Sequence, residues 1–185
     1  ARLTIKDKIK EEAFKTIENL HKQNIQVYML TGDNKDIALD VAKSLNIKES
    51  NVFYEVKPED KLSIIESLQN KMKVAFVGDG INDALALNKA DLSIAMGEGS
   101  DIAKSSSDIT LANNKLKNIS SSIKLSKKVY LNIIENFMWA FSYNIVAIPL
   151  AFVGVLSPVV AGICMAFSNI SVVLNALRLY KVRVN

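Results

Sequence analysis

Residues 77–83, with the sequence VGDGIND, run from an apolar stretch into two carboxylates, Asp79 and Asp83. Carboxylate oxygens are the hard ligands that Mg²⁺ prefers, and two of them four residues apart after an apolar run have little structural purpose of their own. Gly78 and Gly80 lack a Cβ, so the backbone can approach a phosphate closely. This pattern indicates a site for magnesium and phosphate.

Two further segments could complete such a site. Thr31, Gly32 and Asp33 follow the apolar run at residues 25–30, and Lys61 lies just after Pro58. Phosphoryl transfer needs a hydroxyl or amide donor, a fixed cation and a magnesium ion, because charge spreads over the phosphoryl oxygens. Each segment alone has a simpler interpretation, since Thr-Gly-Asp is often a helix N-cap and a single lysine is usually solvated.

The elements around these residues alternate between strand and helix. The expected strands are 2–5, 25–30, 52–56, 74–77, 92–95 and 109–112, and the expected helices are 9–23, 35–45, 59–69 and 82–88. Such alternation predicts an α/β, Rossmann-like fold with a parallel sheet between helices. The carboxyl ends of its strands would carry the three polar segments.

The second half of the chain has a different composition. No Asp, Glu, Lys or Arg occurs from Asn136 to Leu177, and Ser157-Pro158 divides this stretch into expected spans at 137–156 and 159–179. About twenty helical residues cross a hydrocarbon core of about 30 Å. Basic residues flank both spans, which places both ends of a transmembrane hairpin in the cytosol: Lys115, Lys117, Lys124, Lys127, Lys128, Arg178, Lys181 and Arg183.

Charge and cysteine content narrow the function classes. Residues 1–114 hold 15 basic and 18 acidic side chains, whereas 115–185 hold 8 basic and 1 acidic, so the formal +4 comes from the membrane half. Basic residues are not gathered with aromatics on a folded surface, which argues against nucleic-acid binding. The single cysteine, Cys164, excludes an internal disulfide and fits a reducing cytosol for the soluble half.

The order TGDN, VKPEDK, VGDGINDALAL and ADLSIAMGEGSDIAKSSSDITL resembles the phosphorylation domain of a P-type cation-transporting ATPase, within the haloacid-dehalogenase-like superfamily. The resemblance covers nearly the whole chain. It implies a haloacid-dehalogenase-like domain followed by a two-helix transmembrane hairpin. It also implies Mg²⁺ and ATP as cofactors, Asp79 and Asp83 as magnesium ligands, and these catalytic residues: Thr31, Gly32, Asp33, Lys61 and Asn82.

One departure limits that resemblance. The family's nucleophile is the Asp of a DKTGT motif, and the sequence after Asp7 is Lys8, Ile9 and Lys10 instead. We therefore expect no nucleophile in this chain, which would be the carboxyl-terminal part of a longer ATPase and inactive alone. ATP would bind mainly to a nucleotide-binding domain elsewhere. The expected divisions are the phosphorylation domain at 1–114, a cytosolic linker helix at 115–136 and the hairpin at 137–185.

Polar and soft side chains inside the spans indicate a binding site for a transported ion, the cargo. Helix–helix hydrogen bonding by Asn144, Asn169 and Asn175 is one explanation. A thioether, in contrast, suits monovalent copper or silver. Tyr-Asn and MAFSN resemble the YN and MxxSS signatures of copper-exporting ATPases, with Asn in place of the second Ser. That resemblance gives a copper site of Tyr143, Asn144, Met165, Ser168 and Asn169.

The favoured hypothesis is therefore an ATP-driven copper(I) exporter. The spans hold no acidic residue, which a zinc or cadmium transporter would show in its last span, and the family's Cys-Pro-Cys pair would lie in an earlier span. The alternatives are the same enzyme class with silver, divalent copper or potassium, and a non-catalytic membrane-associated subunit. The expected partners are membrane lipid, the amino-terminal part of the ATPase and a copper chaperone, and the expected location is the plasma membrane.

Overall fold

The computed structural model describes residues 9–78, 81–97, 101–111, 113, 115–154 and 156–181. The chain forms two compact units, Ala1–Ser120 and Ser121–Asn185. Each is described by itself below. The strand expected at residues 2–5 lies outside the described part of the chain.

The first unit contains two parallel sheets. β1 (Met29–Leu30) pairs with β2 (Val52–Phe53), and β3 (Ala75–Gly78), β4 (Leu92–Ala95) and β5 (Ile109–Thr110) pair in the order β3-β4-β5. This confirms the α/β prediction with parallel strands. β1 and β2 are shorter than expected, because only two residues of each strand pair with the other strand. Among the described residues, β1 and β3 each have one paired neighbour, so each leaves one edge open.

Helices follow the strands of the first unit: α1 (Glu11–Lys22), α2 (Lys35–Ser44), α3 (Pro58–Gln69), α4 (Ala84–Lys89) and α5 (Asp101–Ser105). Short 3₁₀ turns occur at η1 (Glu49–Asn51) and η2 (Ile81–Asp83). α3 begins with Pro58 in its first turn, where no backbone donor is needed. Ala38 and Ala42 of α2 pack on Ile47 and Val52, and this small core holds the first sheet in place.

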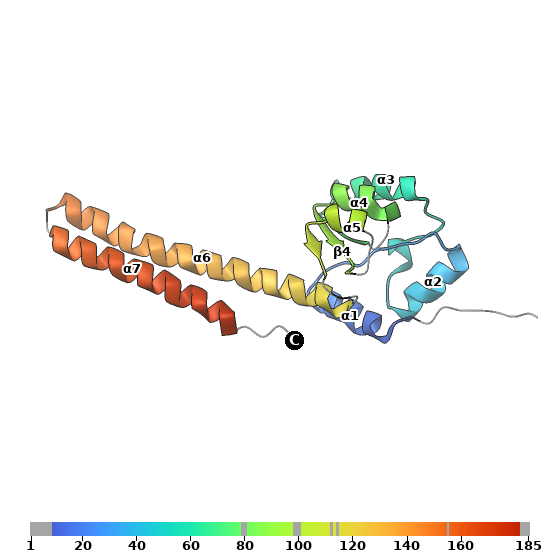
Figure 1. Ribbon diagram of the computed structural model, residues 1–185, viewed down its shortest axis with the longest axis horizontal. Coiled ribbons are helices and arrows are strands. Elements are labelled where there is room, and N and C mark those ends of the chain that lie inside the picture. The colour runs from blue at the N-terminus through green and yellow to red at the C-terminus, as the bar shows by residue number, and fades with distance from the viewer. Residues whose placement is uncertain are drawn as a thin grey trace, which may run out of the picture. The chain divides into compact units, whose positions relative to one another are not determined.

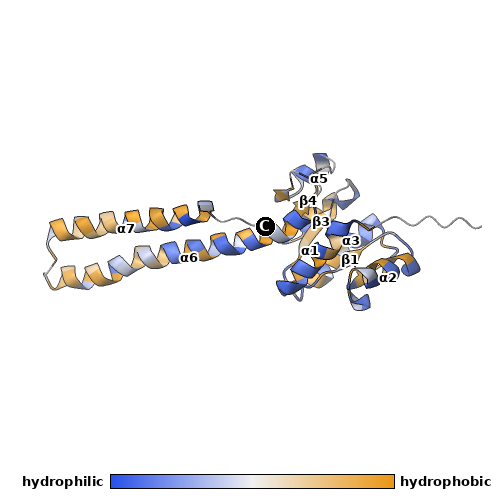
Figure 2. Ribbon diagram, turned by 90° about the horizontal axis from the view of Figure 1, so that it is seen from below, coloured by the Kyte–Doolittle hydropathy of each residue, from blue (hydrophilic) through white to orange (hydrophobic). Residues whose placement is uncertain are grey.

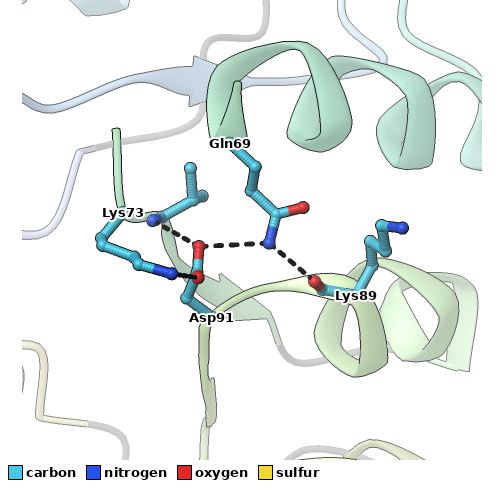
Figure 3. Close-up of polar contacts among 5 residues, drawn as sticks. Gln69, Lys73, Lys89 and Asp91 are labelled. Carbon is cyan, nitrogen blue, oxygen red and sulfur yellow. Dashed lines mark hydrogen bonds and ion pairs between the residues drawn. The ribbon is translucent and has the colours of Figure 1, made fainter. Parts of the chain in front are cut away.

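One carboxylate connects three elements at the amino ends of β3 and β4 (Figure 3). Asp91 accepts hydrogen bonds from Lys73 Nζ at 2.6 Å, from the Val74 amide at 3.0 Å and from Gln69 Nε2 at 3.1 Å. Gln69 also donates to the Lys89 carbonyl at 2.9 Å. The Lys73 hydrogen bond first, and then those of Val74 and Gln69, lower the pKa of Asp91 to about 2. These contacts fasten the end of α3 to the starts of both strands.

The second unit is a pair of long helices. α6 (Lys117–Phe152) and α7 (Pro158–Arg178) lie side by side and run antiparallel, joined at one end by a short turn (Figure 1). A 3₁₀ turn, η3 (Leu179–Lys181), follows α7. Both helices are long and apolar enough to cross a membrane. Figure 2 shows hydropathy rising along α6 toward the turn, while α7 is apolar over most of its length. α6 runs without a break through the segment expected as a separate linker helix.

A seam of small and polar side chains joins α6 to α7. The seam positions are spaced three or four residues apart, which places them on one face of each helix, and all of them are partly or fully covered. The seam comprises Val129, Asn132, Asn136, Ala140, Tyr143 and Ala147 on α6, and Ala161, Cys164, Ser168, Ser171 and Asn175 on α7.

Candidate functional site

The Thr31-Gly32-Asp33 loop follows β1 and is held by β2. The Thr31 amide donates to the Phe53 carbonyl at 3.0 Å, and the Thr31 carbonyl accepts from the Val56 amide at 3.0 Å. Within the loop, Thr31 Oγ1 donates to Asp33 Oδ2 at 2.7 Å and accepts from the Asp33 amide at 3.1 Å. The loop therefore presents a hydroxyl and a carboxylate in a fixed arrangement at the carboxyl end of β1.

The N-cap of α2 is the next residue along, Asn34. Its Oδ1 accepts from the Ile37 amide at 3.0 Å, which satisfies one of the free donors at the helix start. The alternative interpretation of Thr-Gly-Asp as a helix cap is therefore wrong. Neither Thr31 nor Asp33 is used to cap the helix, and Asp33 is exposed to solvent.

Lys61 is bound to Asp83 rather than solvated. Lys61 lies in the first turn of α3, and its Nζ is 2.6 Å from Asp83 Oδ1. The side chains of Lys61 and Asp83 are only 18% and 12% exposed. Asp83 is the N-cap residue of α4, yet its side chain makes no capping hydrogen bond. A covered charge pair is costly to desolvate and gives little net stability, so a purely structural purpose is a weak explanation for it.

Gly78 lies against the same carboxylate. A Cβ on Gly78 would be 2.8 Å from both Cβ and Oδ2 of Asp83, closer than side chains can pack. A Cβ on Gly32 would meet only the Val56 carbonyl oxygen, at 3.7 Å, which is an ordinary contact. Glycine is thus required at the end of β3, where it lets Asp83 lie over the backbone.

Of the remaining predicted residues of this site, the structure describes only Asn82. Asn82 lies in η2 and is exposed, and Asp79 and Gly80 lie outside the described residues. The structure thus brings Lys61 to Asp83 and Thr31 to Asp33. No polar contact joins these two pairs to each other within the described part of the chain. No group of three acidic, histidine or cysteine side chains that could hold a metal occurs among the described residues.

The predicted cargo residues divide between the seam and its flank. On α6, Tyr143 lies in the seam with its hydroxyl 3.5 Å from Ser171 Oγ, while Asn144 is exposed and donates to the Ala140 carbonyl at 3.1 Å. On α7, Ser168 is half-buried in the seam, whereas Met165 and Asn169 are exposed.

Comparisons with known proteins give matches that extend over both halves of the chain. Residues 1–91 and 60–123 match two family models described as haloacid dehalogenase-like hydrolase. The chain is 47% identical over 178 residues to the probable copper-importing P-type ATPase A of Enterococcus hirae, covering 96% of this chain and 24% of that protein. It is 47% identical over 182 residues to the copper-exporting P-type ATPase of Staphylococcus aureus, covering 98% and 22%. The chain belongs to the P-type ATPase family.

A solved P-type ATPase has the same fold across both units. The crystal structure of a zinc-transporting PIB-type ATPase in the E2.Pi state matches with a TM-score of 0.88 at 30% identity, over 94% of this chain and 28% of that one. This P-type ATPase chain is therefore a membrane protein with a haloacid-dehalogenase-like domain. It spans about a quarter of the length of the curated relatives it matches.

The exposed cargo candidates of this P-type ATPase chain share one flank of the hairpin. Asn144, Met165 and Asn169 each come one position after a seam residue. In a right-handed helix the next residue lies about 100° further round the axis. Viewed from one end of the hairpin, this rotation is clockwise for one helix and anticlockwise for its antiparallel neighbour. For two antiparallel helices packed along a seam, these two rotations lead to the same side. The three polar or thioether side chains therefore line one flank.

Sequence reasoning missed the polar cluster at the charged end of this hairpin. Asn132 and Asn136 of α6 contact Asn175 of α7, and of these three only Asn175 was among the asparagines expected to bond between helices. The signal was present in the spacing, because Asn132, Asn136 and Tyr143 follow a repeat of three and four residues. Reading the first span from residue 137 placed both asparagines outside it.

Proposed function

We propose that this chain forms the magnesium-binding part of the phosphorylation site and the last transmembrane hairpin of a copper(I)-exporting P-type ATPase. In that enzyme, formation and hydrolysis of an aspartyl phosphate would drive metal translocation. The observation that carries this proposal is the covered Lys61–Asp83 pair at the end of β3, on the same chain as an apolar hairpin with Met165 on its flank.

In the soluble unit each residue would have a distinct task. Lys61 would neutralise the phosphoryl oxygens, Thr31 would donate its hydroxyl to one of them, and Gly32 with Asp33 would shape the loop around it. Asp79 and Asp83, assisted by Asn82, would hold Mg²⁺, which supplies charge compensation for the transferred group. Carboxylate oxygens suit a hard cation. Lys61 bonds Asp83 Oδ1, so Oδ2, which lies near Gly78, is the oxygen that would bind Mg²⁺.

The nucleophilic aspartate would come from polypeptide outside this sequence. β1 and β3 each have an open edge within the described residues, and Val77 of β3 is 37% exposed although its register partner Ile94 is buried. A further parallel strand that pairs with these edges would bring an aspartate beside Thr31 and Asp83. ATP would reach that aspartate from a separate nucleotide-binding domain.

In the hairpin, Tyr143, Asn144, Met165, Ser168 and Asn169 would bind the transported Cu⁺. The thioether of Met165 is the feature that favours a soft monovalent ion, and the charge-free stretch from Asn136 to Leu177 offers no carboxylate to a hard dication. Relatives named as copper importing and copper exporting match equally well, so the direction of transport rests on the sequence signature. Basic residues at both ends of the hairpin favour a cytosolic location for both ends, in the plasma membrane. A copper chaperone on the cytosolic side remains a proposed partner.

The test is ATP hydrolysis by the whole ATPase polypeptide in lipid, with and without Cu⁺. Copper(I) should stimulate turnover, and Ag⁺ should do so partly because its ligand preference is similar. Stimulation by K⁺ or divalent copper would favour another cation of the same class. Hydrolysis that is absent under all of these ions would favour a non-catalytic subunit.

A further inference from the structure

Four hydrogen bonds gather around Asn175 near the end of α7. Its Nδ2 donates to Asn136 Oδ1 at 2.9 Å, and its Oδ1 accepts from Arg178 Nη1 at 3.0 Å. Asn132 Nδ2 donates to the Asn175 carbonyl at 3.0 Å, and Asn136 Nδ2 donates to Asn132 Oδ1 at 3.3 Å. Two of these bonds join α6 to α7, and the other two orient the amides that make them.

These amides are covered as well as paired. Asn132 and Asn175 are only 7% and 6% exposed, the lowest exposures among the described residues of the second unit. Each of the three amide oxygens accepts a hydrogen bond. The three amides are therefore bonded to one another and to Arg178.

The rest of the seam has little to fix its register. Its other facing positions are mostly small or apolar residues, which offer few polar groups that could define a longitudinal position. Two weaker polar contacts also join the helices. The Tyr143 hydroxyl is 3.5 Å from Ser171 Oγ, and Arg178 Nη1 is 3.8 Å from Glu135 Oε2, with both side chains of that ion pair more than half exposed. A slip of one helical turn, about 5.4 Å, would break both interhelical bonds of the cluster and leave covered amides unpaired.

We infer that Asn132, Asn136 and Asn175 form a register clamp, a set of positioning residues that fixes α6 against α7. The helices are antiparallel, so seam positions are paired by counting forward from Asn136 on α6 and backward from Asn175 on α7. This count places Tyr143 level with Ser168 and Ala147 level with Cys164. Asn144 then lies about 12 Å along the axis from Asn136, and Asn169 about 9 Å from Asn175. The clamp thus holds the proposed cargo residues of two helices at one depth in the membrane. Only this last step rests on the proposed function.

The native Cys164 allows the register to be measured directly. In the full chain, in lipid nanodiscs, Ala147→Cys places a second thiol level with Cys164, and Leu150→Cys places one three residues further along α6. Oxidation with iodine should cross-link position 147 in preference to position 150. Neither metal nor nucleotide takes part, so failure of the transport proposal would leave this result unaffected.

The clamp variants should shift that preference. Asn136→Leu with Asn175→Leu removes both partners of one interhelical bond, and adding Asn132→Leu removes the second. The ratio of cross-linked product at 147 to that at 150 should fall about threefold for each lost bond, or about tenfold in the triple variant. Asn169→Leu makes the same change on the exposed flank and should keep the original ratio.

Two results would overturn the clamp. The first is an unchanged ratio in the triple variant. The second is an equal loss of product at both positions together with a lowered melting temperature, since that would mark the cluster as a source of stability without control of register. A shifted ratio at a melting temperature close to that of the parent chain would support positioning.

Discussion

The two units fix distant side chains by different chemistry. In the soluble unit the residues far apart in sequence meet through charges, as Lys61 does with Asp83 and Lys73 with Asp91. In the second unit the covered contacts between helices are made by neutral amides and a hydroxyl, while the Arg178–Glu135 ion pair at the end of α7 is 3.8 Å long and exposed. Charges are tolerable near water, whereas in a membrane a neutral amide is far less costly to bury. The Lys61–Asp83 pair departs from this rule because it is a covered charge pair in the first unit, and that departure supports the proposal that it belongs to the phosphorylation site.

The largest effect is expected from removing the lysine of that pair. Lys61→Ala in the whole ATPase polypeptide should slow phosphorylation from ATP by about 10²–10³-fold, since a fixed cation near the transferred group is lost. Lys73→Ala is the matched control, because Lys73 makes an ion pair of the same 2.6 Å length but is 91% exposed. Rapid-quench measurement of phosphoenzyme would compare them. Equal phosphorylation rates for the two variants would show that the Lys61–Asp83 pair has no more effect on phosphorylation than the surface pair, and would contradict the proposed role of Lys61.

In the hairpin, Met165→Leu should weaken Cu⁺ binding by at least about tenfold while the protein stays folded, because volume and apolarity are kept and the sulfur is lost. Met138→Leu is the control, since Met138 of α6 is 68% exposed against 66% for Met165 but does not lie on the cargo flank. Competition with a Cu⁺ chelator would measure both affinities. Unchanged Cu⁺ affinity in Met165→Leu would contradict the metal site and indicate that these residues serve helix packing.

A smaller effect is expected from Gly78→Ala. The new methyl group would clash with Asp83 at 2.8 Å, so the free energy of unfolding should fall by about 1–3 kcal/mol as Asp83 and Lys61 are displaced. In Gly32→Ala the new methyl group has only one neighbour, at 3.7 Å, so the free energy of unfolding should change by less than about 1 kcal/mol. Denaturant unfolding of the chain measures this difference. If both variants were equally stable, the close approach of Gly78 to Asp83 would be wrong.

The smallest effect concerns the exposed cluster at Asp91. Its pKa is lowered to about 2 from an ordinary 3.8, so the folded state favours the carboxylate. The stability that Asp91 contributes should be present above pH 4 or so and be lost as the pH falls toward about 2. Asp91→Asn should thus be less stable than the parent at neutral pH, and the two should converge in acid. Thermal melts across this window would show it, and a constant difference would contradict the assigned pairing.

The sequence predicted elements well where local pattern suffices. The helices at 35–45 and 59–69 and the strand at 92–95 match α2, α3 and β4, because capping residues and apolar spacing act locally. It could not show that Lys61 reaches Asp83 or that Asn136 reaches Asn175, since these contacts depend on tertiary packing across 22 and 39 residues. The change from basic to apolar residues near residue 136 suggested the boundary between a linker helix and the hairpin, and α6 is continuous across it because neither composition interrupts a helix.

The central claim is that a phosphoryl site and a soft-cation site are coupled in one protein. Its most direct test is the acid-stable phosphoenzyme formed from ATP by the whole polypeptide in lipid, measured with Cu⁺ and with Zn²⁺. We predict that phosphoenzyme accumulates with Cu⁺, is absent with Zn²⁺, and is lost with Cu⁺ when either Lys61→Ala or Met165→Leu is introduced. Phosphoenzyme that forms regardless of the metal, or with Zn²⁺ in place of Cu⁺, would contradict the account.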